Sequence, residues 1–465
     1  MKGLNLQRAS IVCLSLLFAL LASGCANSSA KFEPSPAPQQ SLFISVSPQY
    51  MELKRGTSST FSATVMNASD STVSWSIGEG SAGGTITDTG VYTAPATEGQ
   101  YHVIATSKAD SAKSASAIVT VRASLFSPTG NLLVGRFSGH TATLLPSGQV
   151  FVAGGMAYGP SGNYELVDDA EEFDPATGTF QSAGKIARSS YSATLLANGD
   201  VLIAGGLVQL SPKEVPTDSV EILKAGSGVL QQTNNLSAPR FGHTATLLQD
   251  GRVLIAGGYV LTSAGVIQET TTAELYDPAI GTFAPTGNMS MPHIFHTATP
   301  LPNGKVLIAG GSTSAELYDP ATNTFRLTGS TAAARLLATM TTLPDGTVLI
   351  TGGEVSYEEI YEGPAEIYDP ATGQFTLVGK MLTPRFEHTA TLLPDGTVLI
   401  AGGAVDADNS TPTVGTEIFH PESGSFTAGP SMKIARAGHT ATLLRDGSVL
   451  VAGGDKTGNT AEIYH

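Results

Sequence analysis

The sequence has few cysteines, few charged residues and no basic run. Its two cysteines, Cys13 and Cys25, both lie near the amino terminus, so the rest of the chain is expected to have no disulfide and no thiol chemistry. Charged residues make up 14% of the chain, and the formal net charge is −15. This acidic balance argues against nucleic acid as a partner and against electrostatic binding to anionic lipid. No segment after the first 25 residues has the pattern of an amphipathic helix of ordinary length, which favours an all-β protein.

The amino terminus has the pattern of an export signal. Lys2 and Arg8 precede an apolar stretch over residues 11–21, which predicts a signal peptide over residues 1–24 that is too short for a permanent membrane span. The small residues before Cys25 resemble the lipobox of bacterial lipoproteins. That resemblance implies lipidation of Cys25, a membrane contact through the lipid anchor only and, because Ala26 follows, the outer membrane if the organism is Gram-negative. The alternative is ordinary signal cleavage and a soluble secreted protein.

Two different segments follow the signal. Residues 25–40 are rich in Ser, Pro, Ala and Gln and predict a flexible tether. Residues 41–123 contain short runs in which apolar and polar residues alternate, a pattern that predicts a β-sandwich. Residues 73–95, with the single tryptophan Trp75 as expected core residue, resemble bacterial Ig-like domains.

From residue 124 to residue 465 one phrase recurs seven times, best seen in GHTATLLQDGRVLIAGG at residues 242–258. The paired glycines that end it are spaced by 42 to 53 residues. Within each copy two apolar runs flank a tight turn and predict a hairpin, and the unbroken VLIA run predicts a strand covered on both faces. The downstream AELYDP phrase supplies a third strand.

This repeat is similar to that of the Kelch family of β-propellers, which implies a seven-bladed propeller over residues 124–465, preceded by the Ig-like sandwich. The last copy ends after three strands. Residues 125–132 read like a fourth strand placed before the first hairpin. We therefore expect them to complete the last blade and so close the ring.

Several polar residues recur in nearly every copy, and such repetition favours a structural role. An arginine stands before most first strands and a glutamate lies in each third strand, which predicts structural charge pairs. The glutamates are Glu171, Glu221, Glu274, Glu316, Glu366, Glu417 and Glu462. Histidines open five of the first strands, at His140, His243, His296, His388 and His439. Because symmetry spreads these histidines around the axis, we expect structural roles and no metal site.

The Kelch-like repeat is also similar to the central domain of galactose oxidase, a copper radical enzyme. The cysteine that such enzymes cross-link to a copper-binding tyrosine is missing after Cys25, so the resemblance covers the scaffold and not the active site. Zinc-protease, nucleophile-elbow and phosphate-loop motifs are absent as well. We expect no catalytic residue, no metal and no cofactor.

The loops that follow the paired glycines differ between copies, and all are expected on one face of the ring, where propellers build binding surfaces. Tyrosines beside carboxylates can stack on sugar rings or dock a basic protein patch; the alternative is a merely solvated acidic loop. The candidate ligand-binding residues are Tyr158, Tyr164, Asp168, Asp169, Glu354, Tyr357, Glu358 and Tyr361. The sequence thus favours an exported, lipid-anchored protein that binds an extracellular glycan or protein without turnover. The other reading is a carbohydrate-active oxidase, hydrolase or lyase on the same scaffold.

Overall fold

The computed structural model describes residues 41–465 apart from 160–162, 211–213, 357–358 and 407–410. Strands and turns make up almost all of this part of the chain, with a short 3-10 helix at Gly80–Gly83. The all-β expectation is confirmed. Among the described residues no helix has the length and apolar character needed to cross a membrane.

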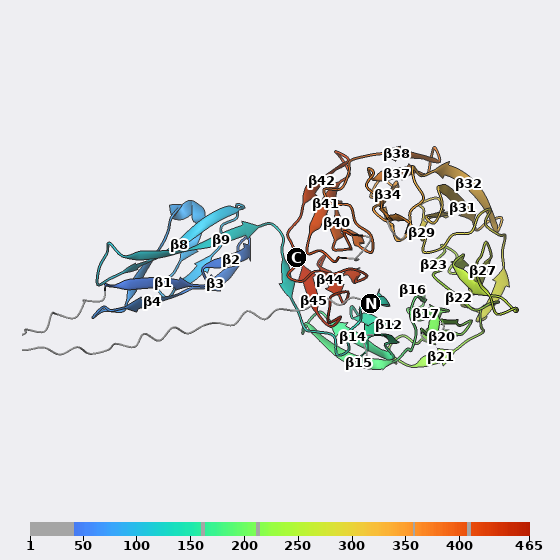
Figure 1. Cartoon of the computed structure of the whole chain (residues 1–465), viewed down its shortest axis with the longest axis horizontal. Helices are drawn as coiled ribbons and strands as arrows, with labels where there is room; N and C mark the ends of the chain where they lie inside the picture. The colour runs from blue at the N-terminus through green and yellow to red at the C-terminus, as the bar shows by residue number, and fades with distance from the viewer. Residues whose placement is uncertain (1–40, 160–162, 211–213, 357–358, 407–410) are drawn as a thin grey trace, which may run out of the picture.

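The amino-terminal part contains three small sheets around one core, to one side of the larger part of the molecule (Figure 1). In the longest strands, every second side chain points inward: Val103 and Ala105 in one strand, and Ala117 and Val119 in its partner, are fully buried. Trp75 packs against this core and is partly exposed. The strands are β1 (Phe43–Ser47) with β4 (Ser62–Met66); β2 (Tyr50–Lys54), β9 (Ser114–Arg122), β8 (Gly99–Ser107) and β5 (Val73–Ile77); and β3 (Ser58–Thr60), β7 (Val91–Thr93) and β6 (Thr85–Ile86).

The larger part contains seven antiparallel sheets that stand around a common centre (Figure 1). We number them sheet 1 to sheet 7 along the chain. Sheet 1 holds β11 (Ser138–Leu144), β12 (Val150–Tyr158), β14 (Asp169–Asp174) and β15 (Thr179–Lys185), with β13 (Tyr164–Leu166) beside β12; sheet 2 holds β16 (Ser192–Leu195), β17 (Val201–Ala204), β20 (Val220–Leu223) and β21 (Leu230–Gln232); sheet 3 holds β23 (Thr244–Leu247), β24 (Val253–Ala256), β27 (Ala273–Asp277) and β28 (Thr282–Pro285).

The same order of four strands continues in the later sheets. Sheet 4 holds β29 (Thr297–Pro300), β30 (Val306–Ala309), β31 (Ser314–Asp319) and β32 (Thr324–Ser330); sheet 5 holds β33 (Thr339–Thr342), β34 (Val348–Thr351), β37 (Glu366–Asp369) and β38 (Gln374–Leu377); sheet 6 holds β39 (Thr389–Leu392), β40 (Val398–Ala401), β41 (Thr416–His420) and β42 (Ser425–Ala428); sheet 7 holds β43 (Thr440–Leu443), β44 (Val449–Ala452), β45 (Ala461–Tyr464) and β10 (Phe126–Pro128).

Three small strand groups lie in the loops that join the second and third strands of sheets 2, 3 and 5, with one strand just before sheet 3. They are β18 (Leu207–Gln209) with β19 (Val215–Pro216), β22 (Arg240–Phe241) with β25 (Tyr259–Leu261) and β26 (Ile267–Glu269), and β35 (Glu354–Ser356) with β36 (Glu359–Ile360).

Sheet 7 combines the two ends of this region. β10, from the start, pairs with β45 at the carboxyl end, with Phe126 opposite Tyr464. The first strands of neighbouring sheets contact one another in sequence, and β43 of sheet 7 contacts β11 of sheet 1. Residues 126–128 therefore supply the outer strand of the last sheet, as the sequence predicts, and cover an edge that would otherwise be unpaired.

The VLIA strands are apolar throughout because each is packed between two neighbouring sheets. In β24, Val253 and Ile255 pack toward sheet 2, whereas Leu254 and Ala256 pack toward sheet 4. All four are buried. Alternate side chains of one strand thus pack into two different interfaces, so neither face of the strand is open to solvent.

The paired glycines join one sheet to the next through the backbone. The Gly155 N–H donates to the carbonyl of Arg188 in the following sheet at 2.7 Å. Gly154 has φ 60°, and a Cβ there would lie 2.4 Å from the same carbonyl oxygen. Glycine is therefore required both for the left-handed backbone and for the close approach. An equivalent bond follows in each sheet, ending with Gly454 and the Arg136 carbonyl of sheet 1.

Candidate functional site

The recurring arginines and glutamates form buried ion pairs that hold the connection entering each sheet. In sheet 1, Arg136 Nη2 lies 2.6 Å from Glu171 Oε1, and the two side chains are 0% and 1% exposed. Arg136 Nη1 also donates to the Gly154 carbonyl, and Glu171 accepts the backbone N–H of Leu133. The same arrangement joins Arg188–Glu221, Arg240–Glu274, Arg335–Glu366, Arg385–Glu417 and Arg436–Glu462. These groups are occupied with one another and with backbone, so they offer nothing to a ligand.

Sheet 4 departs from this pattern in a way that the sequence analysis missed. His293 takes the arginine position, with its Nδ1–H donating to the Gly310 carbonyl at 2.7 Å. Its Nε2 lies 3.5 Å from Glu316 Oε1, and both side chains are fully buried. The sequence signal was the absence of an arginine before the first strand of the fourth copy of the repeat.

The five recurring histidines bridge neighbouring sheets and are buried. His140 Nε2–H donates to the Ala452 carbonyl of sheet 7 at 3.2 Å, and His243 Nε2 lies 3.0 Å from the Ser192 hydroxyl of sheet 2. Burial and the neighbouring arginine lower the pKa of His140 to about 4 and that of His243 to about 3. Tyr191 replaces the histidine in sheet 2 and donates to the Ala153 carbonyl of sheet 1 at 2.6 Å. These neutral side chains therefore link one sheet to the next.

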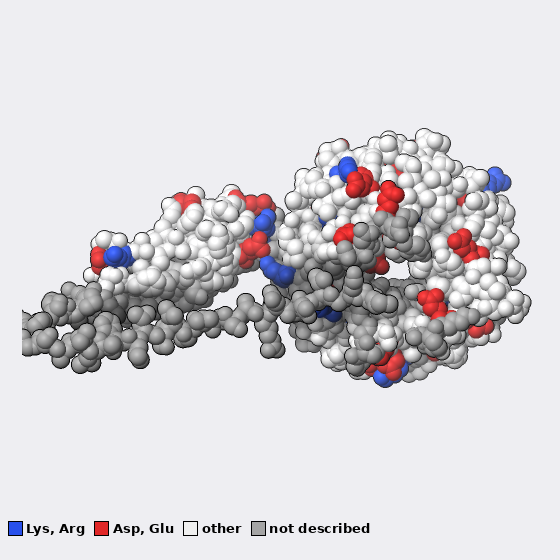
Figure 2. All heavy atoms as spheres, viewed as in Figure 1, with Lys and Arg blue, Asp and Glu red and all other residues white. Residues whose placement is uncertain are grey.

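A pocket of about 580 Å³ opens at the centre of the ring, where the first strands begin and the loops after the paired glycines emerge. We call it the axial pocket. Figure 2 shows a hollow at the centre of the ring with acidic side chains beside it. The residue that precedes the histidine position lines the pocket in every sheet: Gly139, Ser190, Gly242, Phe295, Leu337, Glu387 and Gly438. We call these the seven axial positions.

All seven axial positions have a left-handed backbone, with φ between 43° and 69°. The N–H of Ser190 donates to the Gly139 carbonyl, and Gly242, Phe295 and Leu337 each donate in the same way to the preceding axial position. Three sheets place glycine here, where this conformation is inexpensive, and four place a larger residue that bears the strain. Backbone strain of this kind persists where the surrounding structure fixes it, and it is concentrated at functional sites.

Three carboxylates line the axial pocket, and no Lys or Arg does so among the described residues. Glu354 is 4% exposed. Its backbone N–H and carbonyl form hydrogen bonds of 2.9 Å with the backbone of Leu336, which hold this part of the loop against the next segment. Its carboxylate makes no hydrogen bond or ion pair with a described residue, and the same holds for Glu387. Burial raises the pKa of both groups, and the charge of Glu387 raises that of Glu354 further. Glu214 is the third.

Aromatic side chains form a surface next to the axial pocket. Phe137, Tyr158 and Tyr164 contact one another with ring centroids 5.0 to 5.9 Å apart, and the two tyrosines are about half exposed. We call these three residues the aromatic trio. It borders the pocket, because Ser138 and Met156 line the pocket and the Phe137 N–H donates to the Met156 carbonyl at 2.6 Å. The sequence predicts the two tyrosines as ligand contacts, and the structure brings them together.

The other predicted ligand contacts do not join the aromatic trio. Asp168 and Asp169 pair with Lys185 at 3.2 and 2.8 Å on the outer surface. Tyr361 differs from the expectation of an exposed contact, since its ring lies 4.2 Å from the Arg335 guanidinium and it is 9% exposed. Glu354 also differs in being buried, although it faces the axial pocket. Tyr357, Glu358 and the lipidation site Cys25 lie outside the described residues.

The sequence analysis missed Glu387, Phe295 and Leu337. Their signal was variation at one position of the repeat: three copies have glycine before the histidine position, and four do not. The predicted ligand contacts came from the loops after the paired glycines, and the residue before the histidine position was not among them.

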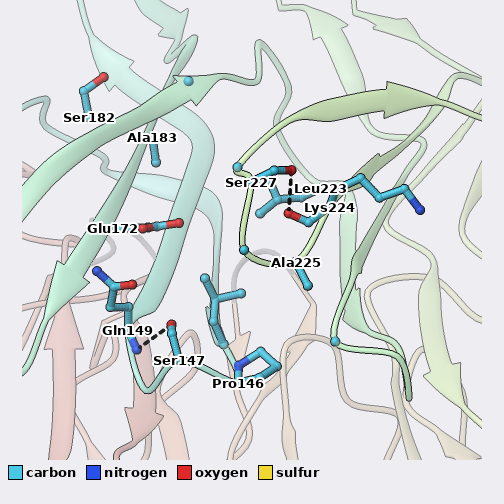
Figure 3. Close-up of a pocket in the computed structure, with 15 residues that line it drawn as sticks. Pro146, Ser147, Gln149, Glu172, Ser182, Ala183, Leu223, Lys224, Ala225 and Ser227 are labelled. Atoms are coloured by element: carbon cyan, nitrogen blue, oxygen red, sulfur yellow. Dashed lines mark hydrogen bonds between the residues drawn. The ribbon is translucent and has the colours of Figure 1, made fainter.

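A larger pocket, of about 830 Å³, lies between the turns of sheets 1 and 2 (Figure 3). Gln149 and Glu172 border it on one side and Ser227 on the other. The Lys224 ammonium donates a hydrogen bond to Asp200 Oδ2 at 2.8 Å. Similar pockets lie between the turns of sheets 2 and 3 and of sheets 5 and 6. A groove that recurs with the repeat is a property of the architecture and gives no reason to place a specific site there.

Comparison with known proteins supports the scaffold. No family model and no curated protein matches the chain. A fungal alcohol oxidase of the AA5 family, solved in complex with copper, is similar in structure with a TM-score of 0.59 and 20% identity, over 73% of this chain and 76% of that chain. The structure of YjhT has a TM-score of 0.47 and 14% identity, over 59% of this chain and 93% of that chain. At this identity the first likeness shows the fold alone, a propeller-like all-β scaffold.

The described residues provide no set of side chains that could bind a copper ion. Within the described residues there is no group of three His, Cys, Asp or Glu side chains placed to hold a metal ion. No cysteine follows Cys25. The described residues therefore do not fit a bound copper ion.

Proposed function

We propose that the protein is an exported binding protein, anchored to the cell envelope by a lipid on Cys25, that recognises an extracellular glycan or protein without turnover. In this proposal the seven sheets are the blades of a closed Kelch-type propeller over residues 124–465. An Ig-like sandwich over residues 41–123 and a tether over residues 25–40 carry it above the membrane, the outer membrane if the organism is Gram-negative.

The observation that carries the proposal is the axial pocket together with the aromatic trio beside it. Exposed aromatic rings that are held by one another give a ligand a large contact area at a small entropic cost. The neighbouring pocket offers unpaired carboxylates, which accept hydrogen bonds from hydroxyl, amide or ammonium groups. Concave sites of this size with a few convergent polar groups are typical of ligand binding.

The test is binding of the full chain, purified in mild detergent, to a panel of cell-wall glycans and secreted proteins, with product analysis of each mixture. The double variant Tyr158→Ala and Tyr164→Ala should weaken binding at least tenfold. Tyr50→Ala is the matched control, because Tyr50 is 70% exposed but lies in β2, away from the pocket. Equal binding by both variants would remove the loop face from the proposal.

A carbohydrate-active hydrolase or lyase is the second candidate, and one observation favours it. Glu354 and Glu387 are two carboxyl groups with raised pKa in one pocket, and such a pair can divide into a general acid and a general base. Cleavage of a panel glycan that is lost in Glu387→Gln would decide for this candidate. Binding with the glycan recovered intact supports recognition alone.

A further inference from the structure

We propose that the axial pocket takes the cationic end of a lysine or arginine side chain presented by a protein partner. This inference deepens the proposed function by naming the group that enters the pocket and by selecting a protein ligand over a glycan.

The axial pocket holds carboxyl groups that have no cationic partner among the described residues. Glu354 is a buried carboxylate that faces the pocket without a partner among the described residues, and Glu387 and Glu214 face the same space. The arginines whose chain segments border the pocket cannot serve it, because Arg335 is paired with Glu366 and Arg385 with Glu417. A buried carboxylate is costly unless a cation or several hydrogen-bond donors reach it. A ligand cation would supply the missing partner.

The walls of the axial pocket combine apolar side chains with these carboxyl groups. Leu207, Phe241, Phe295 and Leu337 line the same pocket as the carboxylates. An apolar lining with carboxylates suits a group with an aliphatic stem and a charged end, which is the construction of lysine and arginine side chains. A phenyl face such as that of Phe295 also attracts a cation. A sugar carries hydroxyls along its whole length and would leave these walls against polar groups.

An anion or a calcium ion suits the axial pocket less well than an organic cation. An anion would meet three carboxylates and a protein of net charge −15, which repel it. A calcium ion requires six or more oxygen ligands, and the described residues do not provide even three metal-binding side chains in one group. The overall negative charge instead speeds the approach of a basic partner.

The pocket histidines do not oppose a cation at neutral pH. His243, His296, His388 and His439 line the pocket together with the three carboxylates. Burial lowers the pKa of His243, His296 and His388 to about 3, and that of His439 also falls well below its usual value. Tyr191, the remaining titratable group in the lining, is uncharged because burial raises its pKa to about 12. Among the described residues of the lining, the carboxyl groups are therefore the ones that can carry charge near neutral pH.

The experiment titrates the full chain, in mild detergent, with Nα-acetyl-lysine N-methylamide and its arginine counterpart, followed by ligand-observed NMR. The uncharged norleucine analogue has the same stem and no charge. We expect the two cationic probes to bind at least tenfold more tightly than norleucine, and Glu354→Gln to reduce their affinity at least tenfold. Glu422→Gln, which removes a carboxylate at the turns of sheet 6, should leave affinity unchanged. Thermal melting confirms that each variant is folded.

Other outcomes overturn the inference. Equal binding of lysine and norleucine probes would mean that charge plays no part. Tighter binding of glucosamine than of the lysine probe would assign the pocket to an amino sugar, and binding of calcium chloride that depends on Glu354 would assign it to a metal ion.

The failure of this inference differs from failure of the proposed function. A panel ligand that needs Tyr158 and Tyr164 but not Glu354 would leave the loop face as binding surface and remove the cation from the pocket. If the lysine probe binds and no panel ligand does, the pocket still takes a cation, but the glycans and proteins of the panel are not the ligands of this protein.

Discussion

Replacing Glu387 by glycine should stabilise the protein, although the side chain belongs to the candidate site. Glu387 holds φ 51° at an axial position where Gly242 and Gly438 hold 62° and 64°. The left-handed conformation costs a residue with a Cβ roughly 1–2 kcal/mol. Part of this stabilisation, about 0.5–1 kcal/mol, is offset because a glycine gives the unfolded chain more conformational freedom. The expected gain from backbone strain alone is therefore about 0.5–1 kcal/mol.

The charge of Glu387 adds to this gain at neutral pH. Burial raises the pKa of Glu387, which means that the folded protein disfavours the ionised form. The resulting destabilisation is present above the folded-state pKa and is lost as the pH falls through it toward the unfolded value. Glu387→Gly should thus gain more at pH 7 than at a pH where the carboxyl is protonated.

Differential scanning calorimetry at pH 7 and at pH 4 separates the two effects. Ser190→Gly is the matched control, because Ser190 holds φ 54° at an axial position and has no charge. Its melting temperature should rise by about 1–3 °C at both pH values, given that 1 kcal/mol corresponds to roughly 2–4 °C for a large domain. Glu387→Gly should exceed the control at pH 7 and approach it at pH 4. A lower melting temperature for Glu387→Gly at pH 7 would refute the reasoning.

Three further predictions follow from the same contacts. Glu274→Ala leaves the Arg240 guanidinium buried without its anion and should lower the free energy of unfolding by about 3–5 kcal/mol in denaturant titration. Asp168→Ala removes an exposed carboxylate and should change the free energy of unfolding by about 0.5 kcal/mol or less. Similar losses from both variants would mean that the two carboxylates do not have different roles. Ile255→Ala removes a side chain packed between sheets 2 and 3 and should cost about 2–5 kcal/mol by the same measurement, and a loss below 1 kcal/mol would contradict the packing. Burial and the charge of Glu387 raise the pKa of Glu354, so binding of the lysine probe should weaken on acidification at a higher pH than the ordinary titration of a surface glutamate; a midpoint at the usual carboxyl value would mean that the probe does not meet this group.

The repeat made the scaffold predictable, because every copy states the same pattern. The strand order, the outer strand from residues 126–128 and the residues of the ion pairs all recur or stand at fixed places in the repeat. The axial pocket was not predictable in the same way. It is formed by single positions of seven sheets, and only the ring brings Glu354 of one loop next to Glu387 of the following sheet.

The loop residues show the limit of composition as a guide to exposure. Tyr361 lies in an acidic loop but stacks on Arg335, a residue that the repeat places under it. Glu354 lies in the same loop and is drawn inward by backbone bonds with Leu336. Tyr158 and Tyr164 remain at the surface, because β13 turns back on β12 and sets the two rings opposite each other. Pairing within a loop, which sequence does not reveal, decided each case.

The residues at the axial positions also make the two sides of the pocket different. Sheets 7, 1 and 3 place glycine there, whereas the consecutive sheets 4, 5 and 6 place Phe295, Leu337 and Glu387. At the axial positions, one side of the pocket is thus lined mainly by glycine, and the other side carries an apolar wall that ends at a carboxylate. The aromatic trio belongs to sheet 1, on the glycine side. A ligand that crosses the trio therefore approaches Glu387 from the side where most axial positions are glycine, and differences at one position of the repeat make the two sides of the pocket unequal.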